Sequence, residues 1–229
     1  LKLNLQLAKQ QGKNTLITFG GAYSNHIAAT ASAAKDYGFK SRGIIRGEEL
    51  EKDNSKWSKT LIKAQQDGMQ LQFVSRQFYR QKNNTEYLQK LQEQYPQAYF
   101  LPEGGTNKLA ILGFEELVND LNSQCPEWSH LFCPVGTGGT FTGLIHFSQK
   151  PHLANRDKLK KLIGIPVLKQ GEYLIPHIQN WLQDFQAFTN ANEDLFLDSF
   201  TVLTQYYSKN ILYSDLAKST FVSPDKCKF

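Results

Sequence analysis

The sequence lacks the segments that take a protein into or across a membrane. No run of about eighteen apolar residues occurs, which excludes a membrane-spanning helix. The N-terminus, starting at Leu1, has neither an initiating methionine nor the apolar stretch of a secretion signal, so we expect a chain truncated at this end. The three cysteines, Cys125, Cys133 and Cys227, form no Cys-x-x-Cys motif and match no zinc-ligand spacing. A cytoplasmic protein without a metal centre is therefore expected.

A basic stripe of the kind that binds nucleic acid is missing as well. The 26 lysines and arginines are scattered among 21 aspartates and glutamates, and the net charge of +5 suits a small anionic ligand equally well. Apolar residues make up 40% of the 229 residues, which is typical of a globular protein with a sizeable core. Neither nucleic acid nor a membrane is expected as a partner.

Most of the chain alternates between strand-like and helix-like segments. Short β-rich runs end in turn residues and are followed by apolar residues at helical spacing. Ser24, for example, is placed to cap a helix that ends at Gly38. The alternation predicts parallel βαβ units of a doubly wound α/β fold, in which ligands bind at the carboxyl ends of the strands. Strands are expected near residues 15–19, 42–46, 71–74, 130–135 and 161–168. Helices are expected near residues 3–11, 24–38, 55–66, 85–95 and 112–121, through residues 144 and 145, and after residue 188.

The strand expected at residues 130–135 leads into a glycine-rich turn at residues 136–140. Three glycines permit positive φ angles and close backbone approach, so that consecutive N–H groups can converge on an anion at the start of the next helix. The hydroxyls of Thr137 and Thr140 add donors. A phosphate is the favoured ligand of this turn, and a tight turn without a ligand is the alternative. Cys133, within the strand, is expected in the core.

Two common nucleotide signatures are absent from this turn. No lysine follows the glycines, as a P-loop requires, and Phe141 stands where a dinucleotide fingerprint has its third glycine. The next strand, ending near Leu168, has no acid at its tip to bind a ribose. A cofactor with a single phosphate fits better, and a nucleotide-dependent oxidoreductase is a disfavoured alternative.

A second glycine turn, at residues 20–26, also joins a strand to a helix. Ser24, Asn25 and the adjacent N–H groups face an opening that suits a carboxylate. An equally good interpretation makes Ser24 a helix cap, with Asn25 and His26 as polar residues of the first helical turn. A single histidine is usually neither a ligand nor a base, and no Ser-His-Asp order can be argued. The residues leave both interpretations open.

A family resemblance is carried by residues 18–31, which read Thr-Phe-Gly-Gly-Ala-Tyr-Ser-Asn-His-Ile-Ala-Ala-Thr-Ala. This segment resembles the core motif of the aminocyclopropane-carboxylate deaminase and D-cysteine desulfhydrase family. Residues 43–48, 101–107 and 134–140 resemble further motifs of that family in the same order, and the resemblance spans roughly residues 1–175. The members are fold-type II pyridoxal-phosphate enzymes related to the tryptophan synthase β subunit.

The resemblance implies a truncated α/β fold with two lobes of doubly wound parallel sheet, of the tryptophan synthase β-like kind. The smaller lobe is expected at residues 14–105. The larger lobe is expected to comprise residues 1–13 and 106–229 and to be incomplete at both ends. Pyridoxal 5'-phosphate is the implied cofactor, a small amino acid the implied substrate, and a homodimer the implied assembly.

The resemblance also assigns roles to individual residues. Asn25 is expected to hydrogen-bond the pyridoxal 3-oxygen. Ser24, with Asn25 and His26, is expected to hold the amino-acid carboxylate, and Ser24 is the candidate catalytic residue. Thr106 and Asn107 are candidates for lining the pocket. The residues expected to hold the cofactor phosphate are Gly136, Thr137, Gly138, Gly139 and Thr140.

Two features depart from the family pattern. The family's Schiff-base lysine lies in an Asn-Lys-x-Arg-Lys-Leu motif, and the start of this chain resembles the residues after that motif, so the lysine is expected before Leu1; Lys2 does not align with it. The family's C-terminal segment, which contacts the pyridine ring and substrate, has no counterpart after residue 188; a truncated chain, a shift in reading frame and a diverged tail are the three explanations that the sequence leaves open. We therefore expect a deaminase or lyase that releases ammonia from D-cysteine or 1-aminocyclopropane-1-carboxylate. The alternative is a truncated, non-catalytic remnant of that family.

Overall fold

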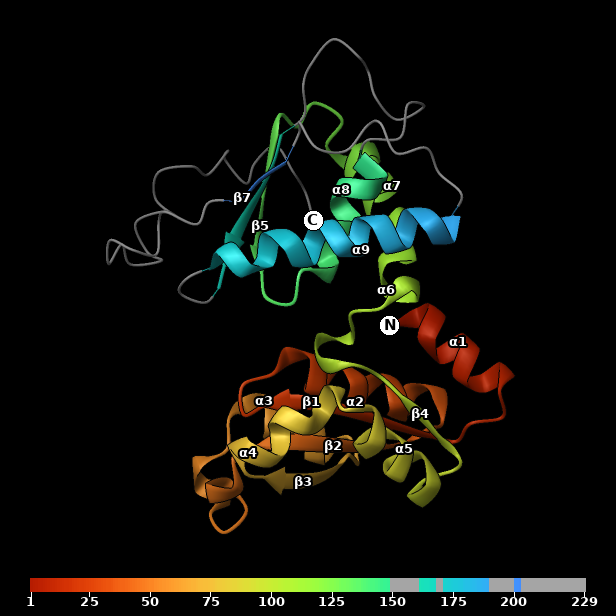
Figure 1. Ribbon diagram of the computed structural model, residues 1–229, viewed down its shortest axis with the longest axis vertical. Coiled ribbons are helices and arrows are strands. Elements are labelled where there is room, and N and C mark those ends of the chain that lie inside the picture. The colour runs from red at the N-terminus through yellow and green to blue at the C-terminus, as the bar shows by residue number, and fades with distance from the viewer. Residues whose placement is uncertain (149–160, 168–170, 190–199, 203–229) are drawn as a thin grey trace. The chain divides into compact units, whose positions relative to one another are not determined.

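The computed structural model describes residues 1–148, 161–167, 171–189 and 200–202 (Figure 1). The chain divides into two compact units, Leu1–Leu109 and Ala110–Phe229, which we call the first unit and the second unit. Each unit contains its own parallel sheet. The α/β architecture expected from the alternating sequence pattern is therefore present in both.

A four-stranded sheet with the order β3-β2-β1-β4 forms the first unit. All its neighbouring strands are parallel, with Phe19 opposite Ile44 and Gly21 opposite Arg46. The helices between these strands make the crossovers that parallel pairing requires. The strands are β1 (Thr15–Gly21), β2 (Lys40–Arg46), β3 (Gln70–Val74) and β4 (Ala98–Phe100).

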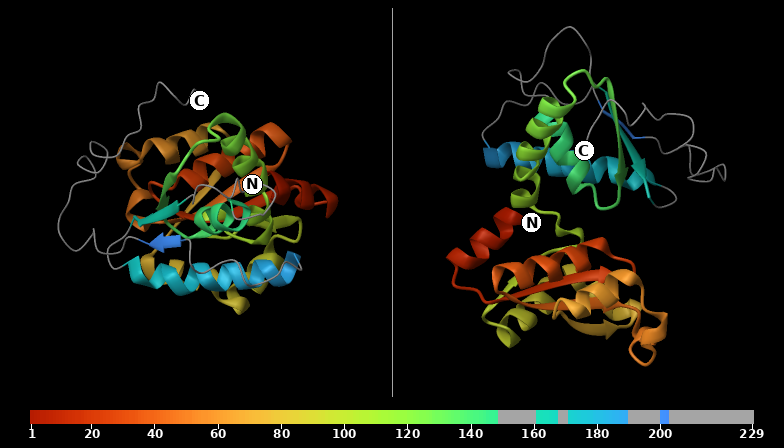
Figure 2. Two further views of the ribbon diagram at one scale, coloured as in Figure 1. Left: turned by 90° about the horizontal axis from the view of Figure 1, so that it is seen from above. Right: turned by 180° about the vertical axis from the view of Figure 1, so that it is seen from behind.

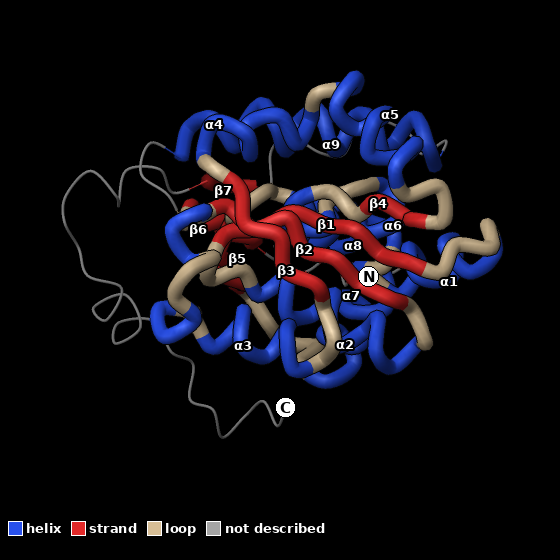
Figure 3. Tube along the Cα trace, turned by 90° about the horizontal axis from the view of Figure 1, so that it is seen from below, coloured by secondary structure: helices blue, strands red, loops and turns tan. Residues whose placement is uncertain are grey.

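Helices cover both faces of this sheet, as Figure 3 shows. The helices α2 (Asn25–Tyr37) and α3 (Lys59–Gln66) lie on one face, and α4 (Arg76–Tyr79) and α5 (Thr85–Gln94) on the other. Successive side chains of a strand point to opposite faces, so Ile44 packs with Phe19 under α4 and α5, while Ile45 packs with Ile27 of α2. Burial on both faces explains why these strands read as short apolar runs.

Helix α1 (Lys2–Gln10) packs on the first unit. Its Leu5 and Ala8 join Leu16, Ala34 and Leu101 in one buried cluster. The sequence-based lobe boundary places residues 1–13 with the other lobe, whereas the contacts of α1 group it with β1 and α2. The lobe boundaries stay a prediction for the family fold.

Two expected helices differ in their bounds. The helix expected over residues 55–66 is replaced at its start by a 3-10 turn, and α3 begins only at Lys59 because the Ser58 side chain caps it by accepting the N–H of Leu61 (3.3 Å). The helix expected through residues 112–121 is divided at Gly113 into α6 (Lys108–Leu112) and α7 (Phe114–Gln124). The 3-10 turns are Glu48–Leu50, Asn54–Lys56, Arg80–Asn83, Glu103–Gly105 and Gly171–Tyr173.

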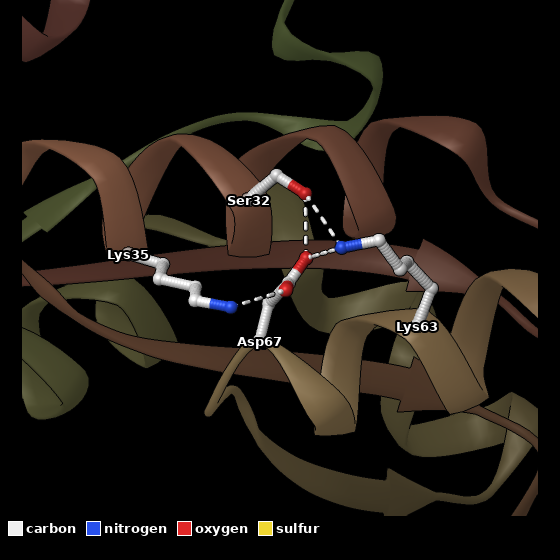
Figure 4. A network of polar contacts seen from close by, with 4 residues as sticks. All are labelled: Ser32, Lys35, Lys63 and Asp67. Carbon is white, nitrogen blue, oxygen red and sulfur yellow. Dashed lines mark hydrogen bonds and ion pairs between the residues drawn. The ribbon is translucent and has the colours of Figure 1, made fainter.

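A buried carboxylate fastens α3 to α2 (Figure 4). The side chain of Asp67, which is 4% exposed, accepts a hydrogen bond from Ser32 Oγ (2.5 Å) and ion-pairs with Lys35 (3.3 Å) and Lys63. The hydrogen bonds from Lys63 and Ser32 hold the pKa of Asp67 well below its usual range. The carboxylate therefore stays ionised and joins the ends of two neighbouring helices.

The second unit contains a three-stranded parallel sheet with the order β5-β6-β7. Its strands are β5 (His130–Val135), β6 (Lys161–Pro166) and β7 (Phe200–Val202). With α7, the helices α8 (Gly139–Ser148) and α9 (Leu174–Thr189, blue in Figure 2) complete the unit. Its core includes Phe141, Ile145, Ile178 and Phe185. Cys133 lies in this core, as the sequence predicted, and burial raises the pKa of its thiol to about 11.

The tail of the chain differs from the expected helix. Residues 200–202 form β7, which pairs with β6 through Ile163 and Thr201, so the helix predicted after residue 188 is wrong there. An extended segment satisfies the backbone groups along the edge of β6, which a helix cannot do. The rest of the expected tail helix lies outside the described residues, apart from the end of α9 at Thr189.

Helices within the described ranges are of moderate length. The helix α9 has 16 residues, and none of the described helices is both long and apolar enough to cross a membrane. Among the same residues, no three histidine, cysteine, aspartate or glutamate side chains gather closely enough to hold a metal ion.

Candidate functional site

The turn between β1 and α2 has the geometry that the sequence predicted. The N–H of Ser24 donates to the carbonyl of Gly21 (3.1 Å), which closes a tight turn. Ser24 Oγ then accepts the N–H of Ile27 (3.3 Å), so Ser24 is the N-cap of α2. The helix ends at Gly38 in the left-handed conformation, with φ of 76°. Both predicted ends of this helix are confirmed.

Glycine at position 20 lets β1 and α2 approach each other closely. A Cβ atom at Gly20 would lie 2.4 Å from Cγ1 of Ile27 and 2.9 Å from Oγ of Ser24. No side chain fits there unless the first turn of α2 moves. Gly20 therefore determines where the start of α2 lies at the carboxyl end of β1.

The start of α2 offers two backbone donors to a ligand. The N–H groups of Asn25 and His26 have no hydrogen-bond acceptor among the described residues, as is usual in a first helical turn. They stand at the positive end of a 13-residue helix, which favours an anion. The Asn25 side chain is exposed beside them. A carboxylate can bind at this place.

The imidazole of His26 has a defined proton position. Its Nε2 lies 2.8 Å from Oγ1 of Thr18, and Thr18 Oγ1 donates its proton to the carbonyl of Leu101 (3.1 Å). A hydroxyl has only one proton to donate, so Thr18 must accept from His26. His26 therefore carries its proton on Nε2.

Burial keeps this imidazole neutral. Burial, and then the positive charge of the N-terminal amine, lower the pKa of His26 to about 4, although the Glu103 carboxylate acts in the opposite direction. The ring also lies against Gly105, where an added Cβ would be 3.0 Å from Cε1 of His26 and φ is +70°. A neutral ring brings no positive charge to a substrate carboxylate. The backbone N–H of His26, rather than its side chain, is the part suited to an anion.

The amide of Asn107 is engaged by Asn4 of α1. Asn107 Nδ2 donates to Asn4 Oδ1 (2.7 Å), and Asn4 Nδ2 donates to Asn107 Oδ1 (3.2 Å). Tyr99 also donates to Asn4 Oδ1 (2.9 Å), and Asn4 is 1% exposed. This reciprocal pair fastens α1 to the segment after β4. Lining of the pocket by Thr106, which is buried, and by Asn107 stays a prediction.

A polar cluster at the carboxyl edge of the first sheet was not expected from the sequence. Tyr79 donates its hydroxyl proton to Glu103 Oε1 (2.6 Å), and Lys82 Nζ lies 3.4 Å from Glu103 Oε2. The guanidinium carbon of Arg46 lies 5.8 Å from the centre of the Tyr79 ring. Burial, and then the hydrogen bond to Glu103, raise the pKa of Tyr79. We call Arg46, Tyr79, Lys82 and Glu103 the edge cluster.

In the second unit, the glycine-rich turn at residues 136–140 joins β5 to α8. Gly138 has φ of 92°, which only glycine adopts readily, and a Cβ there would lie 3.2 Å from Cγ1 of Ile178. The carbonyl of Gly138 accepts both the N–H (2.9 Å) and the hydroxyl (3.0 Å) of Thr142. These contacts fix the start of α8 at the carboxyl end of β5.

The start of α8 has the donors that a phosphate monoester requires. The N–H groups of Gly139 and Thr140 have no acceptor within the described part of the chain, and α8 is 10 residues long. The side chains of Thr137 and Thr140 are exposed. No acidic residue occurs between positions 136 and 140 to repel an anion. The turn therefore fits a phosphate.

The predicted site residues fall into two groups. Ser24, Asn25 and His26 lie in the first unit with Thr106 and Asn107, whereas residues 136–140 lie in the second. Within the first unit, the contact of the His26 ring with the turn before Thr106 brings the two predicted segments together. Both glycine turns follow a parallel strand at its carboxyl end, where doubly wound sheets bind their ligands.

Comparison with known proteins supports the family assignment made from the motifs. Residues 2–173 match the family described as pyridoxal-phosphate dependent enzyme. A Pyrococcus abyssi protein provisionally named as a 1-aminocyclopropane-1-carboxylate deaminase is 30% identical over 196 residues. The mitochondrial bifunctional D-cysteine desulfhydrase/1-aminocyclopropane-1-carboxylate deaminase of Arabidopsis thaliana is 25% identical over 197 residues. Each of these two alignments covers 81% of this chain.

The chain spans about half the length of these relatives, 54% of the Pyrococcus protein and 48% of the Arabidopsis protein. A D-cysteine desulfhydrase of Yersinia enterocolitica is 25% identical over 216 residues, which cover 89% of this chain and 62% of the relative. The similarity therefore concerns one part of each longer protein.

Solved structures confirm the fold. The crystal structure of a homologue of 1-aminocyclopropane-1-carboxylate deaminase has a TM-score of 0.69 at 22% identity, and the match covers 88% of this chain and 59% of that one. The crystal structure of a threonine deaminase has a TM-score of 0.51 at 20% identity, over 71% of this chain and 48% of that one. The predicted parallel α/β fold of the fold-type II kind is confirmed.

Proposed function

Because the chain belongs to the family of pyridoxal-phosphate-dependent enzymes, we propose that it binds pyridoxal 5'-phosphate and the carboxylate of a small amino acid. One observation carries this proposal. Two turns lie at the carboxyl ends of parallel strands, and each leads into a helix. The first N–H groups of both helices have no acceptor among the described residues. Such helix starts bind anions, and the two anions required here are a phosphate and a carboxylate.

The turn at residues 136–140 is the proposed phosphate site. The N–H groups of Gly139 and Thr140 and the hydroxyls of Thr137 and Thr140 are its donors. The exposed side chain of Asn25 is proposed to hydrogen-bond the 3-oxygen of the pyridine ring. When bound, the cofactor supplies an electron sink for bond breaking at the amino acid. The protein residues hold and orient the reacting groups.

The start of α2 is the proposed carboxylate site. The N–H groups of Asn25 and His26 donate to the carboxylate, and the hydroxyl of Ser24 adds a third donor. The oxygen of Ser24 accepts the N–H of Ile27, so the cap bond leaves the hydroxyl proton available for a ligand. A catalytic role for Ser24 beyond this contact stays a prediction.

The proposed reaction is the release of ammonia from D-cysteine or from 1-aminocyclopropane-1-carboxylate, the compounds in the names of the relatives. From the resemblance of the motifs alone, Lys2 is not expected to take the place of the family's catalytic lysine. The assay therefore compares the 229-residue chain with the product of the complete gene. Ammonia is measured with each amino acid in the presence of pyridoxal 5'-phosphate.

A matched pair of serines separates binding from folding in this assay. Ser24 caps α2 and Ser75 caps α4, so replacing either by alanine removes one cap bond, which costs about 1 kcal/mol. We expect Ser24→Ala to lower kcat/KM for ammonia release by about tenfold or more, because it also removes a donor to a charged group. Ser75→Ala should leave kcat/KM near the wild-type value.

Two results would contradict the proposal. If pyridoxal 5'-phosphate does not bind, as judged by its absorbance spectrum, the phosphate site is wrong. If the cofactor binds but the complete gene product releases no ammonia from any small amino acid, the alternative of a non-catalytic remnant is supported instead. A homodimer and a cytoplasmic location also stay predictions, and sedimentation equilibrium tests the first.

A further inference from the structure

The 3-10 turn Glu103–Gly105, which we call the 103–105 turn, lies beyond the end of β4 at the carboxyl edge of the first sheet. It contacts β1 and, through the His26 ring, the start of α2. The N–H of Gly105 donates to the carbonyl of Pro102 (2.9 Å), which closes the turn. The 103–105 turn therefore reaches α2 at the proposed carboxylate site.

The imidazole of His26 has little room beside this turn. A Cβ atom at Gly105 would lie 3.0 Å from Cε1 and 3.2 Å from Nδ1 of the ring. Both distances are shorter than an ordinary van der Waals contact, so a side chain at Gly105 would displace the ring. The Nε2 proton of the same ring is accepted by Thr18 (2.8 Å). The imidazole is thus held by β1 through one contact and by the 103–105 turn through another.

These contacts bear on ligand binding because of the place of His26 in α2. It is the second residue of the helix, and its N–H, like that of Asn25, has no acceptor among the described residues. A side chain held by two contacts restricts the backbone of its own residue. Donors that are fixed before binding lose less conformational freedom when the ligand arrives. A firmly held 103–105 turn therefore favours binding at the start of α2.

Tyr79 anchors the first residue of the 103–105 turn. Its hydroxyl donates to Glu103 Oε1 (2.6 Å), and Lys82 Nζ lies 3.4 Å from Glu103 Oε2. Tyr79 is 4% exposed and belongs to a buried cluster, where its ring centre lies 6.4 Å from that of Phe19. A ring packed in the core has little freedom to move, so its hydrogen bond fixes the position of Glu103.

The same hydrogen bond concerns the charge of Glu103. Burial and the N-terminal amine lower the pKa of His26, and the Glu103 carboxylate raises it, so the charge of Glu103 acts at the start of α2. A negative charge there repels the carboxylate of a ligand. The Tyr79 hydroxyl and the Lys82 ammonium both stabilise the Glu103 carboxylate where it meets α4 and the following 3-10 turn. Position and charge are thus two separable effects of this anchor.

We propose that Tyr79 is a positioning residue for the carboxylate site: through Glu103 it holds the 103–105 turn against the His26 ring and so fixes the N–H groups at the start of α2. Tyr79 acts through other residues, because its hydroxyl is engaged by Glu103. This inference rests on the proposed function, since it deepens the role of the same site. It gives a role in ligand binding to α4, which lies on the face of the sheet opposite α2 (Figure 3).

Backbone amide signals of the isotopically labelled 229-residue chain provide the test. The signals of Asn25 and His26 are followed while 1-aminocyclopropane-1-carboxylate is added. We expect Tyr79→Phe, which removes the hydroxyl and keeps the ring, to raise the Kd about three- to tenfold, the equivalent of one hydrogen bond. Ser75→Ala, which removes the cap of the same helix α4 without touching Glu103, should leave the Kd near the wild-type value.

Glu103→Gln separates position from charge. The amide oxygen of glutamine still accepts the proton of Tyr79, so the 103–105 turn stays anchored although the negative charge is removed. Loss of the ion pair with Lys82 should change the Kd by about twofold at most, as for exposed charge pairs. Glu103→Ala, which removes the anchor, should raise the Kd as Tyr79→Phe does. It also serves as the second variant, because the Glu103 side chain is 37% exposed and tolerates truncation.

The pKa of the His26 ring is a second measurement, and it requires no ligand. Burial is the largest cause of its lowering to about 4. When the 103–105 turn loses its anchor, water reaches the ring, so Tyr79→Phe should raise this pKa towards the ordinary value of about 6.5. The proton shifts of the ring are followed as the pH is lowered from about 7. Ser75→Ala should not change the pKa, because a general loss of stability does not alter hydration of the ring in the folded chain.

Four results overturn the inference. They are an unchanged Kd in Tyr79→Phe, an equal rise of the Kd in Ser75→Ala, a rise in Glu103→Gln as large as that in Tyr79→Phe, and an unchanged His26 pKa in Tyr79→Phe. Preserved dispersion of the other amide signals shows that each variant remains folded.

Failure of the proposed function looks different. If the wild-type signals of Asn25 and His26 do not move, the carboxylate site fails and this inference fails with it. If the ligand binds in a Tyr79-dependent way but the complete gene product releases no ammonia, the enzyme assignment fails while the role of Tyr79 stands. If ammonia is released and the Kd is independent of Tyr79, only this inference fails.

Discussion

Replacing Thr18 by valine keeps the shape of the side chain and removes one hydroxyl from the centre of the first unit. Thr18 is fully buried. Its Oγ1 donates to the carbonyl of Leu101 (3.1 Å) and accepts the Nε2 proton of His26 (2.8 Å). The variant therefore leaves two polar groups without their partner at once.

The expected loss of stability arises from the burial of those two groups. A buried polar group left unsatisfied costs about 1–3 kcal/mol. Leu101 is fully buried, so leaving its carbonyl without a donor should cost the full desolvation free energy of that group. The imidazole of His26 is only partly buried and can regain some hydration. The sum is about 2–4 kcal/mol, a large fraction of the roughly 5–15 kcal/mol that stabilises a typical domain.

Hydrogen exchange measures this change in the first unit separately from the second. Amide protons of Ile17 and Ile44, buried in the sheet, report its opening free energy. We expect this free energy to fall by about 2–4 kcal/mol in Thr18→Val. Thr15→Val is the matched control, because the Thr15 hydroxyl donates to Asn14 Oδ1 (2.8 Å) at the surface; its change should stay below about 0.5 kcal/mol.

The control also defines the contrary outcome. If Thr18→Val and Thr15→Val lower the opening free energy equally, the buried hydroxyl does not join Leu101 to His26. The assignment of the His26 proton to Nε2 then loses its basis. Thr18→Ser, which keeps the hydroxyl, should by contrast remain within about 1–2 kcal/mol of the wild type, because it loses only one buried methyl group.

Three further predictions concern the same unit. Its stability should fall as the pH decreases from about 6.5 towards 4, because His26 binds a proton in the unfolded chain but not in the folded chain, where its pKa is about 4. The free energy of unfolding in urea should change by about 1.4 kcal/mol per pH unit in this range, and His26→Gln should remove that dependence. Below about pH 4 the stability should fall further, because Asp67 has a lowered pKa in the folded chain and therefore binds a proton in the unfolded chain first. This further loss of stability should be absent in Asp67→Asn. Gly20→Ala should destabilise by about 1–3 kcal/mol through overlap with Ile27 at 2.4 Å, and Ile27→Ala should cost less in that background than in the wild type when thermal unfolding is compared.

Features that depend on neighbouring residues could be predicted from the sequence. The cap at Ser24 and the left-handed end at Gly38 involve hydrogen bonds within one or two helical turns, so the residue types alone indicate them. The turn at residues 136–140 is similar, because Gly138 needs a positive φ where a strand meets a helix. The breaks at Ser58 and Gly113 were missed, since the surrounding residues also suit a continuous helix.

Contacts between distant residues could not be predicted in this way. Asn4 and Asn107 pair across 103 positions, and nothing in either local segment indicates the other. The edge cluster is assembled from β2, α4 and two 3-10 turns, which meet only because the strands share a carboxyl edge. The sequence does show an arginine at a strand end and a glutamate in a glycine turn. It does not show that the two residues lie close together, because that depends on the order of the strands in the sheet.

The order of the residues was enough to establish the parallel α/β pattern, the two glycine turns and the family, because each depends on residues that act over a few positions or in a fixed succession. Packing in three dimensions was needed to establish the state of His26, which is neutral with its proton on Nε2, and the engagement of Asn107 by Asn4. A pKa and a hydrogen-bond partner depend on which groups displace water from a side chain. Those groups are brought together by the fold, from positions far apart in the chain.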